Sequence, residues 1–340
     1  MSAARPVAAI LVPTHDHAAT LDLAVRSALE QTVAEIEVVV IGDGVGEDTR
    51  EVVAGLARED SRVRFLDLPK GPNHGEVHRG TAIDATAAEL VCYLCDDDLL
   101  LPEHVESMAE LLADADFANS QNGYLERDGS WHPYFSDLAS AGFREWTTRP
   151  DRSGVSLTGT AHTVAAYRRL PHGWRTTPPG RYPDHYMWEQ FLTQPWVRAV
   201  TATRITAVQF PSHLEGRADL APAERRAELQ AWRATLADPE GRARLEEVAH
   251  RALMAEATRE QIERDKFQTG QERAETGRID AESRLKDAES RLIAAQSRLA
   301  AAEEILRAIA ETRTWRLRDR LLRFAPLRAL ARRTRRDRAP

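Results

Sequence analysis

The chain has 340 residues, of which 42% are hydrophobic and 29% are charged, so wholesale disorder is excluded and either about two domains or one domain with an extended segment is expected. The formal net charge of −7 argues against nucleic-acid binding by the whole chain, although residues 313–340 contain eleven Arg and two Asp. Two cysteines, Cys92 and Cys95, exclude a disulfide framework, and no apolar run approaches the roughly 20 residues that span a bilayer. We therefore expect a cytoplasmic protein, either soluble or peripheral.

The first hundred residues alternate between apolar runs and stretches with helical spacing. The apolar runs predict strands at 7–12, 36–41, 63–68 and 90–95, and helices are expected at 19–31, 47–57, 76–88 and from Pro102 onward. Strands that alternate with helices through short connections favour a parallel α/β sheet. Ligands bind such sheets at the carboxyl ends of the strands. Pro13, Thr14, Asp43 and the acidic run 96–98 occupy these positions.

The rest of the chain divides into a less regular part and a helical part. Residues 114–217 are richer in Trp, Tyr, Pro and His, and we expect 103–217 to form the acceptor half of a domain that spans 1–217. From Pro222 the composition predicts helix to about residue 312. We assign 218–280 to a helical linker, 281–312 to a coiled coil and 313–340 to a basic tail.

The coiled-coil prediction rests on a heptad repeat. Leu recurs every seven residues and Ala follows three residues after each of the first three Leu, at Leu285, Leu292, Leu299, Leu306, Ala288, Ala295 and Ala302. Apolar residues at these two heptad positions form a seam between helices. Because Ala buries little surface, we expect self-association through this segment to be weak.

The basic tail combines its eleven Arg with Trp, Leu and Phe side chains. An Arg-rich helix with an apolar face can lie in the interface of an anionic membrane. A solvated arm, or a tail that folds back onto the acidic remainder of the chain, are the alternatives. We favour association with the inner face of the plasma membrane.

Asp96, Asp97 and Asp98 form the strongest chemical signal in the sequence. Three adjacent carboxylates repel one another, so holding them together without a cation is costly. Oxygen ligands suit Mg²⁺ or Mn²⁺, and such an ion can neutralise a leaving diphosphate. The alternative is a solvated acidic turn.

Three segments, in order, resemble the family 2 glycosyltransferases, whose fold is called GT-A. The segment ILVPTHDHAATLDLAVRSALEQT resembles the family's first strand, Pro-Thr/Ser turn and first helix, and EVVVIGDGVGEDT resembles its second strand and acidic turn. The segment HGEVHRGTAIDATAAELVCYLCDDDLLLP resembles its helix, strand and metal motif. The resemblance implies a Rossmann-like, mostly parallel sheet with helices on both faces, followed here by a long helical extension.

The resemblance also implies an activity: metal-dependent, inverting transfer of a sugar from a nucleotide-diphosphate donor to a hydroxyl of a cell-envelope glycan or lipid-linked acceptor. Thr14, after Pro13, would lie near the nucleotide base, Asp43 would contact the base or ribose, and Arg79 would reach the nucleotide. The acids 96–98 would hold the cation and the diphosphate. The family often reads Asp-x-Asp-Asp, with its first Asp where Cys95 stands, so the metal-binding register stays open between Asp96 with Asp98 and Asp97 as the direct ligand.

On the acceptor side, an inverting transfer needs a general base. Asp184 fits this role by position, with Glu189 as the alternative base and helix capping as the alternative role of Asp184. His213 would approach the metal or the diphosphate. Gly42 and Cys95 depart from the family pattern, which motivates a rival interpretation: a non-catalytic GT-A-like domain on a coiled-coil scaffold in a polysaccharide-assembly complex.

Overall fold

The structure is a computed structural model that describes residues 5–214, 216–311, 316 and 320. It divides into two units, Met1–Ala257 and Thr258–Pro340. Except for Arg316 and Arg320, the basic tail lies outside the described residues, and with it the predicted membrane contact. Among the helices that are described, none combines the length and the apolar character needed to cross a bilayer.

A seven-stranded sheet forms the centre of the first unit, in the order β10-β6-β9-β4-β1-β2-β3. The strands are β1 (Ala8–Thr14), β2 (Ile36–Asp43), β3 (Val63–Leu68), β4 (Leu90–Tyr93), β6 (Phe117–Asn119), β9 (Thr160–Thr163) and β10 (Ala199–Thr201). Strands β1 to β4 pair in parallel, as β6 does with β10, whereas β9 runs antiparallel to both of its neighbours, β4 and β6. The predicted mostly parallel sheet is confirmed.

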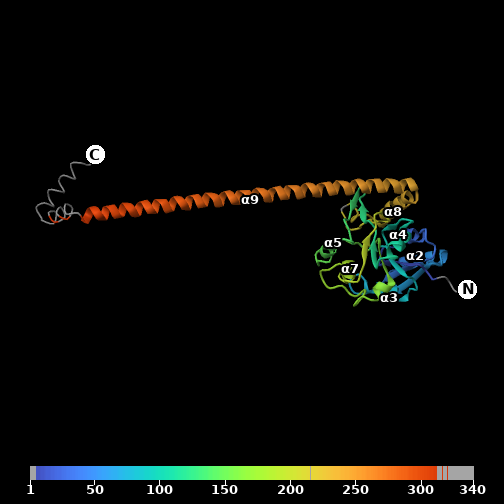
Figure 1. The fold of residues 1–340 in the computed structure, drawn as a ribbon. Coiled ribbons are helices and arrows are strands. Elements are labelled where there is room, and N and C mark those ends of the chain that lie inside the picture. The colour runs from blue at the N-terminus through green and yellow to red at the C-terminus, as the bar shows by residue number, and fades with distance from the viewer. Residues whose placement is uncertain (1–4, 215, 312–315, 317–319, 321–340) are drawn as a thin grey trace. The chain divides into compact units, whose positions relative to one another are not determined.

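Helices cover both faces of this sheet (Figure 1), as alternate residues of β1 indicate. Ala8, Ile10 and Val12 face the core under α1 (Ala18–Leu29), α2 (Glu47–Glu59) and α4 (His104–Leu112). Ala9 and Leu11 face the core under α3 (Val77–Ala85), α6 (Val164–Tyr167) and α7 (Pro183–Leu192). Because successive strand residues point to opposite faces, a strand that is covered on both sides is apolar throughout.

The remaining elements frame the sheet. A short strand, β5 (Leu99–Leu100), pairs with β11 (Ala207–Val208), and β7 (Gly123–Leu125) pairs with β8 (Trp131–Pro133). Helix α5 (Ala141–Thr147) lies between β8 and β9 in the chain. The helix expected from Pro102 begins instead at His104, and the helix expected over 76–88 ends at Ala85.

Two C-terminal helices follow: α8 (Pro222–Ala237) and α9 (Pro239–Glu311). A third apolar cluster joins Leu23 of α1 to Leu229 and Leu236 of α8 and to Leu245 and Ala249 of α9. Helix α8 and the start of α9 are therefore part of the packed first unit. The domain boundaries placed at 217 and 280 from the sequence stay predictions.

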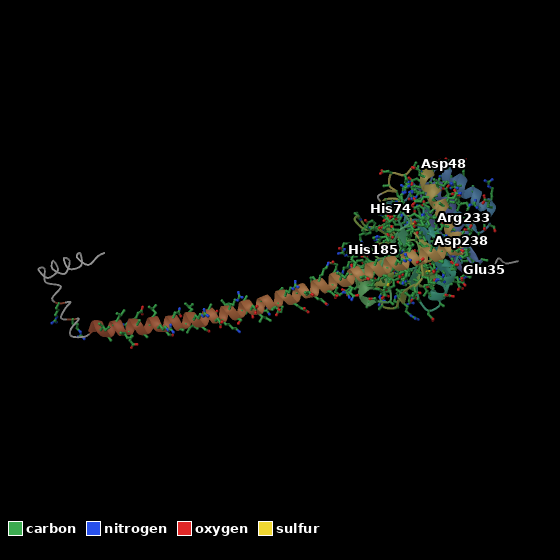
Figure 2. The ribbon with its side chains drawn as sticks, turned by 90° about the horizontal axis from the view of Figure 1, so that it is seen from above. Glu35, Asp48, His74, His185, Arg233 and Asp238 are labelled. Carbon is green, nitrogen blue, oxygen red and sulfur yellow. The ribbon has the colours of Figure 1, made fainter. Side chains whose placement is uncertain are left out.

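In the second unit, α9 continues as helix to Glu311. Its side chains project on every side of the helix (Figure 2). The four heptad leucines are 57% to 66% exposed.

Candidate active site

A cleft of about 270 Å³ opens where β1, β2 and β4 end. All six residues that the sequence predicts to contact the donor line it: Pro13, Thr14, Asp43, Arg79, Asp96 and Asp97. They meet because parallel strands present their carboxyl ends at one edge of the sheet, and the loops that follow the strands converge there. Their contacts with a donor stay predictions.

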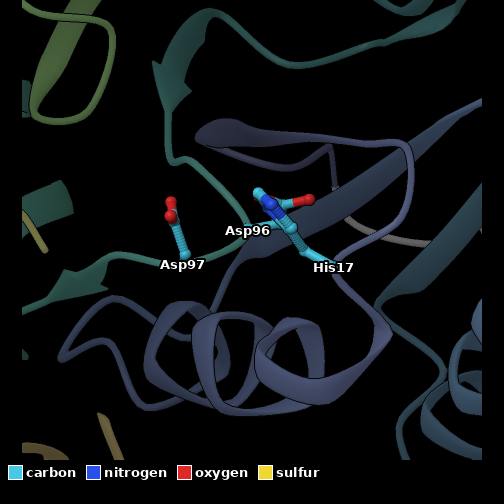
Figure 3. A group of neighbouring side chains, drawn as sticks. All are labelled: His17, Asp96 and Asp97. Atoms are coloured by element: carbon cyan, nitrogen blue, oxygen red, sulfur yellow. The ribbon is translucent and has the colours of Figure 1, made fainter. Parts of the chain in front are cut away.

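One group of side chains in this cleft has the geometry of a metal site. Single ligand atoms of His17, Asp96 and Asp97 all lie within 4.8 Å of one another. His17 approaches from the start of α1, and the two acids follow β4 on the connecting loop (Figure 3). Two buried carboxylates and an imidazole are suitable ligands for a divalent cation, with Mn²⁺ accepting both donor types.

Each of these carboxylates has a positively charged partner from the chain itself. His17 Nδ1 lies 2.9 Å from Asp96 Oδ1, and this hydrogen bond, although opposed by burial, raises the pKa of His17 to about 9. Arg225 of α8 donates from Nη2 to Asp97 Oδ2 at 2.7 Å. Burial and the neighbouring Asp96 raise the pKa of Asp97. His17 and Arg225 supply the positive charge next to Asp96 and Asp97 in this structure, and a bound divalent cation would supply positive charge at the same place.

Asp98 points away from this group. Its Oδ1 accepts a hydrogen bond from the backbone N–H of Phe210 at 2.8 Å, and its Oδ2 lies 2.5 Å from the Thr158 hydroxyl. Burial, reinforced by Asp97, raises the pKa of Asp98 to about 8. The geometry therefore favours Asp96 and Asp97 over any metal register that uses Asp98, and Asp98 anchors the loop on which they lie.

At the end of β2, a short basic loop surrounds Asp43. Its carboxylate accepts hydrogen bonds from Lys70 and from the backbone N–H of Gly71, and His78 Nε2 lies 3.4 Å away. Burial alone would raise the pKa of Asp43, but Gly71 and Lys70 outweigh it, so the pKa lies below its usual value. Asp43 is therefore a carboxylate at neutral pH.

Arg79 and Thr14 bring unused hydrogen-bonding groups to the cleft. The Arg79 side chain is buried, with its guanidinium 4.7 Å from the centre of the Trp174 ring. Its Nε and Nη1 and the buried Thr14 hydroxyl have no hydrogen-bond partner among the described residues. Buried donors without partners are costly, so an anionic or hydroxylated ligand would stabilise them.

Asp184 is the second residue of α7, directly after Pro183 at the helix start. Burial raises its pKa, although the backbone N–H of His185 and the charge of Arg79 lower it in part. It is close enough for the charge of Arg79 to lower its pKa, although it is not among the residues that line the cleft. A partly desolvated carboxylate of raised pKa suits a general base.

The two other predicted site residues lie apart from this arrangement. Glu189 forms an ion pair with Arg181. His213 is exposed, and the metal-capable group in the described residues contains His17 instead. Only its neighbour Ser212 lines the cleft. The roles of Asp184, Glu189 and His213 stay predictions.

The sequence analysis did not single out His17, Lys70 or Arg225. His17 lies five residues beyond the strand predicted at 7–12, so a search for every titratable residue near the end of a strand would have found it. Lys70 has the same kind of signal after the third strand. Arg225 has none, because it is one Arg among many on a helix 128 residues beyond Asp97.

A mostly parallel α/β sheet with acidic and basic side chains gathered at its strand ends is typical of domains that bind a ligand at this edge. Residues 9–172 match the family model described as Glycosyl transferase family 2. The predicted resemblance to glycosyltransferase family 2 is therefore confirmed for residues 9–172, which are just under half of the chain.

Two curated relatives illustrate the match. The GalNAc(5)-diNAcBac-PP-undecaprenol beta-1,3-glucosyltransferase of Campylobacter jejuni is 26% identical over 134 residues, which is 38% of this chain and 42% of that protein. The chondroitin synthase of Pasteurella multocida is 31% identical over 128 residues, which is 37% of this chain and 13% of that protein. The chain thus matches less than half of the length of either relative.

Among solved structures, the mannosyltransferase PcManGT of Pyrobaculum calidifontis, in complex with GDP-Man and Mn²⁺, is similar with a TM-score of 0.46. The two chains are 18% identical, and the match covers 75% of this chain and 76% of that one.

Proposed function

We propose that this chain is a metal-dependent, inverting glycosyltransferase that moves a sugar from a nucleotide-diphosphate donor to a hydroxyl of a cell-envelope glycan or lipid-linked acceptor. The observation that carries the proposal is the meeting of His17, Asp96 and Asp97 with the other donor-contact candidates in one cleft of a family 2 domain. The Campylobacter relative, named for a PP-undecaprenol compound, supports the choice of a lipid-linked acceptor.

The donor half of the site divides into three tasks. Thr14 and Asp43 bind the nucleoside, and Arg79 donates to the donor's anionic groups through its two unpartnered nitrogens. Asp96 and Asp97, with His17 in its neutral form, hold the cation. When bound, Mg²⁺ or Mn²⁺ supplies positive charge that stabilises the departing diphosphate.

The acceptor half supplies the base. Asp184 takes the proton of the acceptor hydroxyl while that oxygen bonds to the anomeric carbon. The bond from this carbon to the diphosphate oxygen breaks in the same displacement, so the configuration inverts. The electron pair leaves with the nucleoside diphosphate. Arg79, whose charge reaches Asp184, keeps part of the base ionised before the acceptor arrives.

A calorimetric panel of nucleotide sugars, each with Mn²⁺, tests the proposal. We expect one donor to bind with a micromolar to millimolar Kd, and we expect Asp97→Asn to lose the Mn²⁺-dependent part of that binding. If no donor binds to the folded protein, the rival scaffold function is favoured, as the departures at Gly42 and Cys95 would suggest.

The same proposal includes a location. A lipid-linked acceptor lies at a membrane surface, and the Arg-rich segment 313–340 would attract the chain to an anionic leaflet. We place the protein in the cytoplasm, at the inner face of the plasma membrane.

A further inference from the structure

Residues 281–306 of α9 present an apolar stripe that nothing in the second unit covers, as far as the chain is described. Leu285, Leu292, Leu299 and Leu306 are each more than half exposed. Together with the Ala residues at 281, 288, 295 and 302, they recur at the first and fourth positions of a heptad. These are the positions that meet a partner helix in a coiled coil.

The charged residues that flank this stripe are sorted by sign. Arg284, Arg291 and Arg298 each stand one residue before a stripe leucine. On the other edge, one residue after each stripe alanine, stand Glu282, Glu289, Gln296 and Glu303. One edge of the stripe is therefore positive and the other is negative.

Most of these charges have no partner within their own helix. The ion pairs in this part of α9 join Arg278 to Glu275 and to Glu282. Within the described residues, no ion pair involves the three Arg of the positive edge, Glu289 or Glu303. Both edges thus carry charge available to a second helix.

We propose that residues 281–306 bind a second copy of this chain as a parallel, in-register, two-stranded coiled coil. In that arrangement the residue before a leucine in one chain faces the residue five positions later in the other chain. Arg284 then meets Glu289, Arg298 meets Glu303, and Arg291 meets the neutral Gln296. Every charged contact between the edges is attractive.

The antiparallel arrangement is the main competitor. It would place each leucine opposite an alanine of the other chain, so that every layer of the seam would contain side chains of the same total volume. However, it would also place the Arg edge against the Arg edge and the Glu edge against the Glu edge. Charges at these flanking positions govern helix orientation, and like charges disfavour it. The parallel dimer follows from the charge pattern.

The seam has a defined beginning. Continuing the leucine positions toward the N-terminus gives Arg278 and Gln271, which are polar, and Arg278 is already engaged by two glutamates of its own helix. Gly270 and Gly277 lower the helix propensity there. The dimer contact is therefore confined to about four heptads, and we expect it to be weak and concentration-dependent. It is independent of the proposed function.

Sedimentation equilibrium of the full chain tests the contact. We expect a monomer–dimer equilibrium in which Leu292→Asp together with Leu299→Asp shifts the chain to monomer. Ser283→Asp together with Ser290→Asp is the matched control, because these residues lie on the opposite side of the helix and should leave the equilibrium unchanged. A monomeric wild type over the whole concentration range, or equal behaviour of the two double variants, would overturn the proposal.

Two measurements test the orientation. Raising the salt concentration should weaken a parallel dimer, since its edges attract, and should strengthen an antiparallel one. Under oxidation, Ala281→Cys should cross-link with itself, and so should Ala302→Cys, while Ser283→Cys on the outer side should not. Cross-linking of Ala281→Cys that requires a mixture with Leu306→Cys would show an antiparallel pair and refute the assignment, because Ala281 faces Leu306 when each leucine meets an alanine.

Discussion

Asp184 and Glu189 lie five residues apart at the start and middle of α7, yet their surroundings differ. Burial raises the pKa of Asp184, whereas Glu189 is committed to Arg181. We expect Asp184→Asn to lower kcat by about 100-fold, because general-base assistance contributes that order, and to leave the donor Kd within about twofold.

Glu189→Gln is the matched control and should retain most of the activity. Donor binding is measured by calorimetry and turnover by release of the nucleoside diphosphate. Should Asp184→Asn abolish donor binding while the fold survives, the residue acts on the donor side and the assignment is wrong.

At the proposed metal site, Arg225 would compete with a metal ion for Asp97. In Arg225→Ala the buried Asp96 and Asp97 lose one positive partner, so we expect the affinity for Mn²⁺ without donor to rise. Loss of one charged hydrogen bond corresponds to about tenfold in the binding constant. Arg226→Ala is the control, because Arg226 pairs with Asp22 on α1 and not with the acidic motif. Electron paramagnetic resonance of free Mn²⁺ measures both variants, and equal affinities would contradict the competition.

His104 links the core to acid stability. It is fully buried, its Nδ1 lies 2.9 Å from the Thr206 hydroxyl, and burial lowers its pKa to about 3. Between pH 6.5 and 3 the unfolded chain binds a proton at this residue that the folded chain does not. The free energy of unfolding should therefore fall as the pH drops, by up to about 1.4 kcal/mol per pH unit from this residue.

Replacing this histidine with a side chain that does not titrate removes its part of the slope. We expect His104→Gln to show a shallower loss of stability between pH 6.5 and 5 in urea unfolding, whatever its stability at pH 7. An unchanged slope would mean that His104 does not stay neutral in the folded protein.

At the scale of elements, the loop between β3 and α3 depends on one glycine. Gly75 has a φ of +61°, and an added Cβ would lie 2.2 Å from the Asp43 carboxyl carbon. Gly75→Ala should therefore displace Asp43 and weaken donor binding, in addition to the cost of about 1 kcal/mol or more for a left-handed residue.

Gly180→Ala separates the two effects. Gly180 has a similar φ of +79°, and no described atom lies within 4 Å of the added Cβ. It should lose stability in thermal unfolding without losing donor affinity. Equal donor affinities in the two alanine variants would show that Gly75 does not position Asp43 for binding.

The nucleotide-binding half was predictable because its information is local. Strands β1, β2 and β4 are mostly apolar, and polar residues stand at or just after the end of each one, so the cleft lining could be located from these strand ends. The register of the acidic motif could not. Whether Asp97 or Asp98 faces the cleft depends on Thr158 and Phe210, which lie 60 and 112 residues further along the chain.

The second half was harder for the same reason. Strand β9 has only four residues, Thr160–Thr163, and reads as polar and small rather than as a core strand. It joins the sheet by pairing with β4 on one side and β6 on the other. This pairing depends on the rest of the fold and not on the sequence of the segment. The pairing of Arg225 with Asp97 could not be predicted from the sequence either, because it depends on the packing of α8 against α1.

At the scale of the whole molecule, charge is unevenly distributed. Residues 313–340 carry +9, so the remaining 312 residues carry −7 − 9 = −16. We expect the full chain to co-sediment with anionic vesicles at low salt, because each Arg near the surface contributes about 1 kcal/mol of binding free energy. Salt screens this attraction, so the chain should dissociate as the salt concentration rises. A chain that ends at residue 312 should stay in solution, and neutral vesicles should bind neither. Equal binding of both chains would show that the tail is not responsible for membrane association.

The antiparallel strand β9 also has a consequence for synthesis on the ribosome. Strand β4 is complete at Tyr93, but its second neighbour begins only at Thr160, 67 residues later. Because synthesis adds roughly 5–20 residues per second, one apolar edge of β4 stays unpaired for several seconds until β9 is made. The edge of β6 that pairs with β9 is unpaired until then as well. We therefore expect nascent chains stalled between residues 100 and 160 to be bound by chaperones and readily cleaved by protease, and chains stalled some 40 residues beyond Thr201 to be protected.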